Sequence, residues 1–183
     1  MSKLCARDQV NPAMNASPLI DLFTVTLLFG LLALAVVSDI EAMRIPNRIC
    51  LCIVALYPSH VLASAAPIDW PGATAAAAAV FGLGLIPFLF RLMGGGDVKL
   101  MAALALWAGP GVVVDFMAVT FFLGGVMALL MISPFRFAMA RTCEAIGRED
   151  FGEVLLNRAI PYAIAIAGGG YLTVGPRLLS AIG

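Results

Sequence analysis

Two aspartates are the residues of this sequence best suited to do chemistry. Asp97 follows three consecutive glycines, Gly94 to Gly96, and Asp39 lies shortly before Pro46. Each aspartate stands beside a long apolar segment, and no polar loop separates the glycines and Asp97 from the apolar segments on either side. An ionised aspartate at membrane depth costs about 2.5–3.5 kcal/mol even on the insertion scale, so it is a candidate functional residue. Two carboxylates that share one proton can work as an acid–base pair in hydrolysis.

Composition assigns the chain to the membrane proteins. Of its 183 residues 62% are hydrophobic and 12% are charged, and the mean hydropathy is +1.01. A soluble domain is usually about half apolar and a quarter charged. The 11 basic and 11 acidic residues balance, so we expect no nucleic-acid partner. The four cysteines form no C-x-x-C pair, and we expect neither a metal nor a cofactor.

The apolar segments predict an all-α integral membrane protein, a bundle of about six transmembrane helices. A polar N-terminal tail, 1–18, precedes this domain, 19–183. The connection 134–160 reads either as an amphipathic helix on the membrane surface or as a solvated loop. The fourth segment is only about 20 Å long, against a core of about 30 Å. If it reaches the far side, Asp97 is recessed below the membrane surface. The expected segments are 19–38, 47–66, 73–92, 97–109, 112–133 and 161–182.

The basic residues predict the orientation of the bundle. Six helices place the connections after the first, third and fifth segments on one side, and positive residues favour the cytoplasm. Both termini are then expected outside the cytoplasm. Asp39 and Asp97 come to one level near the cytoplasmic face. The basic residues on that side are Arg44, Arg48, Arg91, Lys99, Arg136, Arg141, Arg148 and Arg158.

These residues give the sequence a resemblance to a known family. Gly94-Gly95-Gly96-Asp97 matches the GxGD motif, and Val98-Lys99-Leu100 follows it as is common there. Asp39, with Ile45-Pro46-Asn47 behind it, matches a first catalytic aspartate, and Ile160 to Ala165 resembles a last-helix entry. The pattern resembles that of type IV prepilin peptidases, among the GxGD intramembrane aspartyl proteases.

The resemblance implies a membrane aspartyl endopeptidase with Asp39 and Asp97 as its catalytic pair. It implies substrates of the prepilin and pseudopilin type, whose short basic leader is cut after glycine, just ahead of a hydrophobic helix. No cysteine quartet of the larger, methylating members occurs, so the chain resembles the short peptidase-only form of Flp (tight adherence) pilus systems. The expected location is the bacterial inner membrane, as a multi-pass protein in contact with lipids. The residues expected to support the site are Gly94, Gly96, Lys99, Pro46 and Asn47.

The sequence alone leaves several interpretations open. The chain could be a non-catalytic membrane protein, such as a transporter or a pilus-assembly scaffold, because membrane carboxylates also serve ion relays. Asp97 could be an N-cap of the next helix. Lys99 either follows the positive-inside rule, or it tunes the charge of Asp97 or contacts the backbone of the substrate. Asp39 should meet the negative end of its helix and Asp97 the positive end of its own, which favours Asp39 as the acid and Asp97 as the base.

Overall fold

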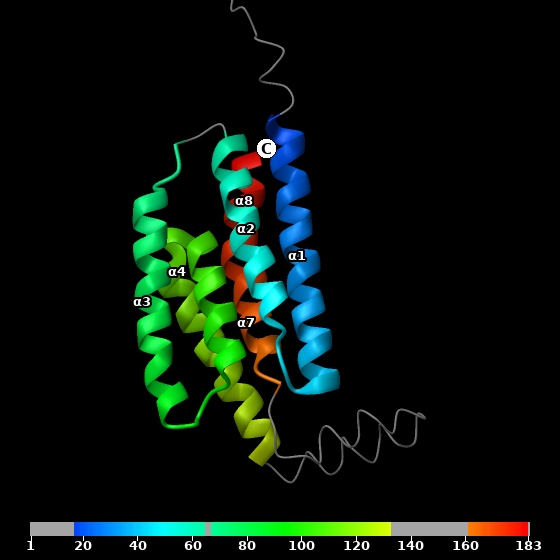
Figure 1. Cartoon of the computed structure of the whole chain (residues 1–183), viewed down its shortest axis with the longest axis vertical. Coiled ribbons are helices and arrows are strands. Elements are labelled where there is room, and N and C mark those ends of the chain that lie inside the picture. Colours follow the sequence, from blue (N-terminus) through cyan, green and yellow to red (C-terminus); the bar gives the residue numbers. More distant parts are fainter. Residues whose placement is uncertain (1–16, 65–66, 133–160, 183) are drawn as a thin grey trace, which may run out of the picture.

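The computed structural model describes residues 17–64, 67–132 and 161–182, and its regular elements there are all helices (Figure 1). The all-α class predicted from the sequence is therefore confirmed for these residues. Helices α1, α3 and α4 are long and apolar enough to cross a membrane, while α2 is apolar but shorter. The helices are α1 (Ser17–Ala42), α2 (Asn47–Ala63), α3 (Trp70–Leu89), α4 (Gly95–Ile132), α7 (Ala163–Gly169), η2 (Gly170–Val174) and α8 (Gly175–Ile182).

Helix α4 consists of two helices that meet at a sharp break. Gly109 has φ 62° and ψ 178°, and Pro110 follows it. A positive φ favours glycine, and proline removes a backbone donor from the helix that follows. The Arg177 guanidinium donates to the carbonyl of Ala108 at 2.6 Å, which pairs one of the carbonyls at the end of the first part. The break agrees with the predicted boundary between the fourth and fifth segments.

The first part of α4 leaves space at the end where it breaks. In Figure 1 the break lies well short of the upper ends of α1 and α2. A cavity of about 330 Å³ occupies this region, and Tyr57, Trp107 and Arg177 are among its lining residues. The short helix ends close to the start of α3, since a Cβ added at Gly72 would lie 3.0 Å from the Pro110 Cγ. The recessed position of Asp97 stays a prediction.

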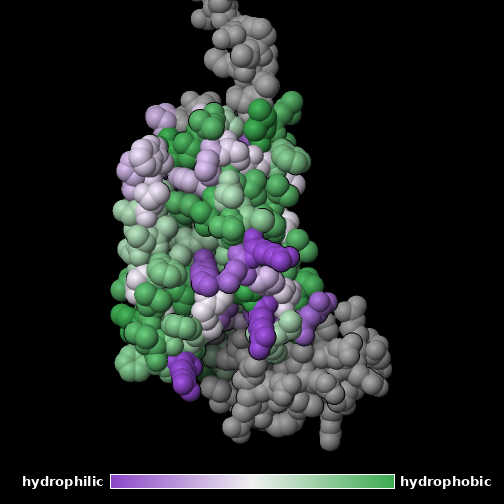
Figure 2. All heavy atoms as spheres, in the orientation of Figure 1, coloured by the Kyte–Doolittle hydropathy of each residue, from purple (hydrophilic) through white to green (hydrophobic). Residues whose placement is uncertain are grey.

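The ends of the helices that carry Asp39 and Asp97 lie together. Figure 1 shows α1 and α3 ending, and α2, α4 and α7 beginning, at the lower end of the bundle. Hydrophilic side chains gather over the lower half of the face shown in Figure 2, while most of the remaining described surface is apolar. Alternating helix directions thus bring the two aspartates to one end, as the order of the segments predicted.

The last helical run packs closely against α4. Its glycines allow this approach, because a Cβ added at Gly169 would overlap the Thr120 hydroxyl and one at Gly168 would lie 2.9 Å from Leu123. Ile166 and Val174 are fully buried in the core that results. This packing fixes where α7 begins, which matters for Asp39.

Candidate functional site

Asp39 and Asp97 line the same cavity, which has a volume of about 280 Å³. Asp39 belongs to the last turn of α1, and Asp97 to the first turn of α4. The two carboxylates are close enough for their charges to interact. The remaining lining residues come from the connection after α1 and from the glycines before Asp97, and they are Met43, Arg44, Ile45, Gly94, Gly95 and Gly96.

Asp39 is buried, with 7% of its surface exposed. Helix α1 continues to Ala42, beyond the predicted end at Ser38, and stops where Met43 takes φ 50°. The Asp39 carboxylate accepts a hydrogen bond from the backbone N–H of Ala163 at 3.0 Å. Asp39 thus meets the first N–H of α7 as well as the carboxyl end of α1. Asp39 lies in the last turn of α1 and Asp97 in the first turn of α4, as expected, but the Ala163 N–H gives Asp39 a helix-start donor as well and so reduces the expected contrast. The assignment of acid and base stays a prediction.

Asp97 folds back over the start of its own helix. Helix α4 begins at Gly95, and the Asp97 carboxylate accepts a hydrogen bond from the backbone N–H of Gly94 at 3.3 Å. The Asp97 N–H in turn donates to the Gly94 carbonyl at 3.1 Å. This resembles the acidic position of a capping box, three residues after the cap. The N-cap interpretation is thus wrong in position, since Asp97 reaches back from within the first turn.

The glycines before Asp97 are needed for close approach. A Cβ at Gly94 would lie 2.9 Å from the Asp97 carboxylate oxygen. A Cβ at Gly96 would lie 3.0 Å from the Ile45 Cβ and 3.4 Å from the Ile45 carbonyl oxygen. The distances of 2.9 Å and 3.0 Å are shorter than ordinary van der Waals contact. The first glycine therefore leaves room for the Asp97 carboxylate, and the second brings the connection after α1 against α4.

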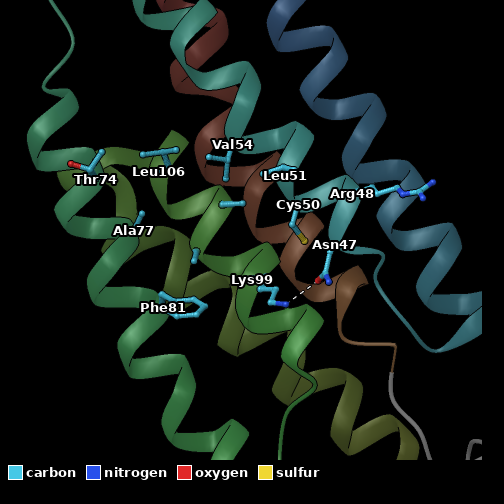
Figure 3. Close-up of a pocket in the computed structure, with 12 residues that line it drawn as sticks. Asn47, Arg48, Cys50, Leu51, Val54, Thr74, Ala77, Phe81, Lys99 and Leu106 are labelled. Carbon is cyan, nitrogen blue, oxygen red and sulfur yellow. Dashed lines mark hydrogen bonds between the residues drawn. The ribbon is translucent and has the colours of Figure 1, made fainter.

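The predicted supporting residues Asn47 and Lys99 contact each other rather than an aspartate. Pro46, with φ −61° and ψ 133°, takes the cap position of α2 without a side-chain hydrogen bond. Asn47 is therefore the first residue of α2 and not its cap. Its side-chain oxygen instead accepts a hydrogen bond from the Lys99 ammonium at 2.9 Å (Figure 3). This bond ties the start of α2 to the start of α4, next to the aspartates.

Two residues at the start of the last helical run were not predicted to belong to the site. Ala163 supplies the backbone donor to Asp39. The Tyr162 ring lies over Gly124, where a Cβ would come within 2.5 Å of it, and the phenol is close enough to feel the charge of Asp97. Both residues stand in the stretch from Ile160 to Ala165 that contributed to the resemblance. The resemblance of that stretch could have pointed to these two residues. No local sequence pattern, however, shows which side chain a backbone N–H will contact.

Other features predicted from the sequence lie outside the site. The tail and the connection 134–160 lie outside the described residues, apart from Ser17 and Pro18, which begin α1. His60, expected to be a packed or lipid-facing histidine, is buried against the Asp21 carboxylate and stacks on Trp107 with ring centroids 5.1 Å apart. This pair lies at the opposite end of the bundle from Asp39.

Comparison with known proteins bears on the identity of the chain. No curated protein and no solved structure shows a significant match to it. The stretch 26–129, more than half of the 183 residues, matches the type IV leader peptidase family. The match includes both Asp39 and Asp97. The chain therefore belongs to the type IV leader peptidase family.

Proposed function

We propose that this protein is a membrane aspartyl endopeptidase that removes the leader peptide from prepilins. Asp39 and Asp97 are its catalytic pair. The observation that carries the proposal is that these two residues, 58 positions apart in the sequence, line one cavity of about 280 Å³. The family of the chain consists of aspartic-type peptidases, which supports the same chemistry.

The reaction follows from two carboxylates that share one proton. Close like charges cannot both ionise without cost, so one carboxyl group keeps its proton. The ionised carboxylate takes a proton from water, and the oxygen of that water attacks the peptide carbonyl carbon. The protonated carboxyl group donates to the carbonyl oxygen. When the C–N bond breaks, the leaving amine takes up a proton from the pair, and no covalent enzyme intermediate forms.

The supporting residues hold this pair in place. Gly94 and Gly96 allow the Asp97 carboxylate and the Ile45 backbone to come close. Pro46 starts α2, and the hydrogen bond between Asn47 and Lys99 keeps that start beside α4. These residues act through the position of the aspartates and do not take part in proton transfer. They are positioning residues in this proposal.

The bundle crosses the membrane six times in this proposal, with the catalytic cavity at the cytoplasmic face and both termini outside. The break at Gly109 supports two crossings within α4, and the last helical run, from Ala163 to Ile182, supplies the final one. The cavity end carries Arg44, Arg48 and Lys99, as the positive-inside rule requires of a cytoplasmic side. In this proposal residues 1–18 form a polar N-terminal tail and residues 19–183 form the transmembrane peptidase domain.

The substrates are prepilins and pseudopilins with a short basic leader followed by an apolar helix. The absence of a cysteine quartet from the sequence supports the peptidase-only form of Flp systems, without N-methyltransferase activity. The location is the bacterial inner membrane, where α1, α3 and α4 contact lipids through their apolar surfaces.

Co-expression with a candidate prepilin tests the proposal. The wild-type protein should convert the prepilin to the shorter form, which intact-mass measurement detects, and Asp97→Asn should leave it uncleaved. Asp115→Asn is a matched control, because Asp115 is an exposed aspartate in the second part of α4, outside the catalytic cavity. This control should cleave like the wild type. Cleavage by Asp97→Asn at equal protein level would favour a non-catalytic role instead.

A further inference from the structure

A second and larger hollow opens beside the catalytic cavity. It has a volume of about 590 Å³ and lies between α2, α3 and the first part of α4 (Figure 3). Its walls carry apolar side chains that the described residues leave exposed, since Leu51 is 70% exposed, Val54 is 41% exposed and Phe81 is 39% exposed. We call this hollow the α2–α3 groove.

The floor of the α2–α3 groove consists of small residues. Ala102 and Ala103 come from α4, and Ala77 comes from the facing side of α3. Small side chains let a helix backbone approach closely, and this is how helices pack within membranes, where burial of apolar surface from water gives no driving force. The groove therefore has the surface that a further helix requires.

One end of the α2–α3 groove adjoins the catalytic cavity. Asn47 and Lys99 line this end and are hydrogen-bonded to each other. Asn47 follows Ile45, which lines the catalytic cavity, by two positions, and Lys99 follows Asp97 by two positions. The groove and the catalytic cavity thus both lie at the starts of α2 and α4, although they share no lining residue.

We propose that the α2–α3 groove holds the apolar helix that follows the cleavage point of the substrate. This inference rests on the proposed function, because it needs a substrate whose scissile bond lies at Asp39 and Asp97. The helix lies against Ala77, Ala102 and Ala103, between the apolar side chains of α2 and α3. The groove then sets the distance between the membrane-embedded helix and the bond that is cut.

Charge determines which part of the substrate enters the groove. The Lys99 ammonium stands at its entrance, and like charges repel, so a basic leader is disfavoured there. The leader instead stays on the side of the two aspartates. A phospholipid acyl chain could fill the same apolar walls, but it would not connect the groove to the catalytic cavity. Lipid is accordingly the competing occupant that the experiment must distinguish.

Site-specific photo-crosslinking in membranes tests the occupant. Benzoylphenylalanine at position 81 lies in the groove, and the same residue at position 122 is the control, since Phe122 is 70% exposed and lies outside the groove. Both are placed in the Asp97→Asn protein, with a prepilin carrying the full apolar helix. Crosslinks to that helix at 81 and not at 122 support the proposal. Lipid adducts alone at 81, or equal crosslinks at both positions, overturn it.

A groove-filling substitution tests the same point by cleavage. Ala77→Trp should lower kcat/KM for the prepilin by about tenfold, because an indole occupies the volume that the substrate helix needs. Ala79→Trp, on an exposed face of the same helix, should cleave like the wild type. Equal cleavage by both variants overturns the groove proposal. If instead Asp97→Asn still cleaves while crosslinks form at 81, the groove stands and the catalytic assignment falls.

Discussion

The carboxylate of Asp39 accepts a hydrogen bond from the backbone N–H of Ala163 at 3.0 Å, across 124 positions of sequence. This bond attaches the end of α1 to the start of the last helical run. Asp39 therefore has two separable parts to play. It pairs a helix-end N–H, which is a structural role, and under the proposed function it carries or accepts a proton, which is a catalytic one.

Two substitutions at Asp39 separate these roles. Asp39→Asn keeps an oxygen that can accept from Ala163 but cannot ionise, so it should abolish prepilin cleavage with little change in thermal stability. Asp39→Ala loses the acceptor as well, and leaving that N–H unpaired should cost about 1–3 kcal/mol. Cleavage assays and thermal unfolding in detergent measure both effects. Residual cleavage by Asp39→Asn at normal protein level would remove Asp39 from the catalytic pair.

Gly96→Ala should disturb the site through the connection after α1. The added Cβ would lie 3.0 Å from the Ile45 Cβ, so either the connection or the start of α4 must shift. We expect kcat/KM to fall by about tenfold or more, since small displacements of catalytic groups cost about this much. Gly82→Ala is the control, because nothing lies within 4 Å of its added Cβ. It should cleave normally.

A second substitution checks the reason for that loss. Ile45→Gly in the Gly96→Ala background removes the Ile45 Cβ, which is the side-chain atom that the new Cβ approaches. Cleavage should recover in part. Two results together would contradict this reason: no recovery of cleavage in the double variant, and equal losses of kcat/KM in Gly96→Ala and Gly82→Ala. The glycine would then be required for helix flexibility and not for the contact with Ile45.

The sequence was sufficient for the parts of the fold that local chemistry determines. Pro110 and Gly111 predicted the end of the fourth segment, because proline removes a backbone donor from a helix, and the structure has the break beside them, at Gly109. Alternating helix direction brought Asp39 and Asp97 to the same end without any knowledge of contacts. Helix ends were less accurate, since α1 runs to Ala42 and α3 starts at Trp70, where the Asp69 side chain accepts from the Gly72 N–H at 3.0 Å.

The partners of the polar groups could not be predicted. Asp39 pairs with Ala163, Lys99 with Asn47, and His60 with Asp21, and all three pairs join distant segments. Periodicity and turn residues show which face of a helix is buried, but not which residue of another helix stands opposite. That depends on the rotation and the shift of each helix, which close packing at glycines such as Gly169 determines.

The hydrogen bond between Asn47 and Lys99 should contribute modestly to cleavage. Both side chains are exposed, so we expect Asn47→Ala and Lys99→Ala each to lower kcat/KM by a few-fold, as about 0.5–1.5 kcal/mol allows. The double variant should lose little more than either single one, because the two residues act through one bond. A double-mutant cycle measures this coupling. Fully additive losses would mean that Lys99 acts independently, for instance directly on the substrate.

The buried pair of His60 and Asp21 should stabilise the bundle without taking part in cleavage. His60 is 5% exposed and Asp21 is 3% exposed, and the pair lies away from the catalytic cavity, because Asp21 stands near the start of α1 and Asp39 in its last turn. His60→Ala leaves a buried carboxylate without its partner and removes the ring that stacks on Trp107. Loss of one member of a buried pair costs about 3–5 kcal/mol, so the unfolding temperature should fall by about 6–20 °C.

The two members of this pair should not be equivalent. Asp21→Asn should cost less than His60→Ala, because histidine can stay neutral and hydrogen-bond to an amide, whereas an unpaired buried carboxylate must either lose its charge or remain unsatisfied. Leu62→Ala, in the same turn as His60 but 87% exposed, is the control and should change stability by no more than about 0.5 kcal/mol. Thermal unfolding in detergent gives the order of the three variants. Their cleavage of prepilin at a temperature where all are folded should match the wild type. A His60→Ala protein that is stable but inactive would place catalytic function at this end of the bundle and contradict the assignment to Asp39 and Asp97.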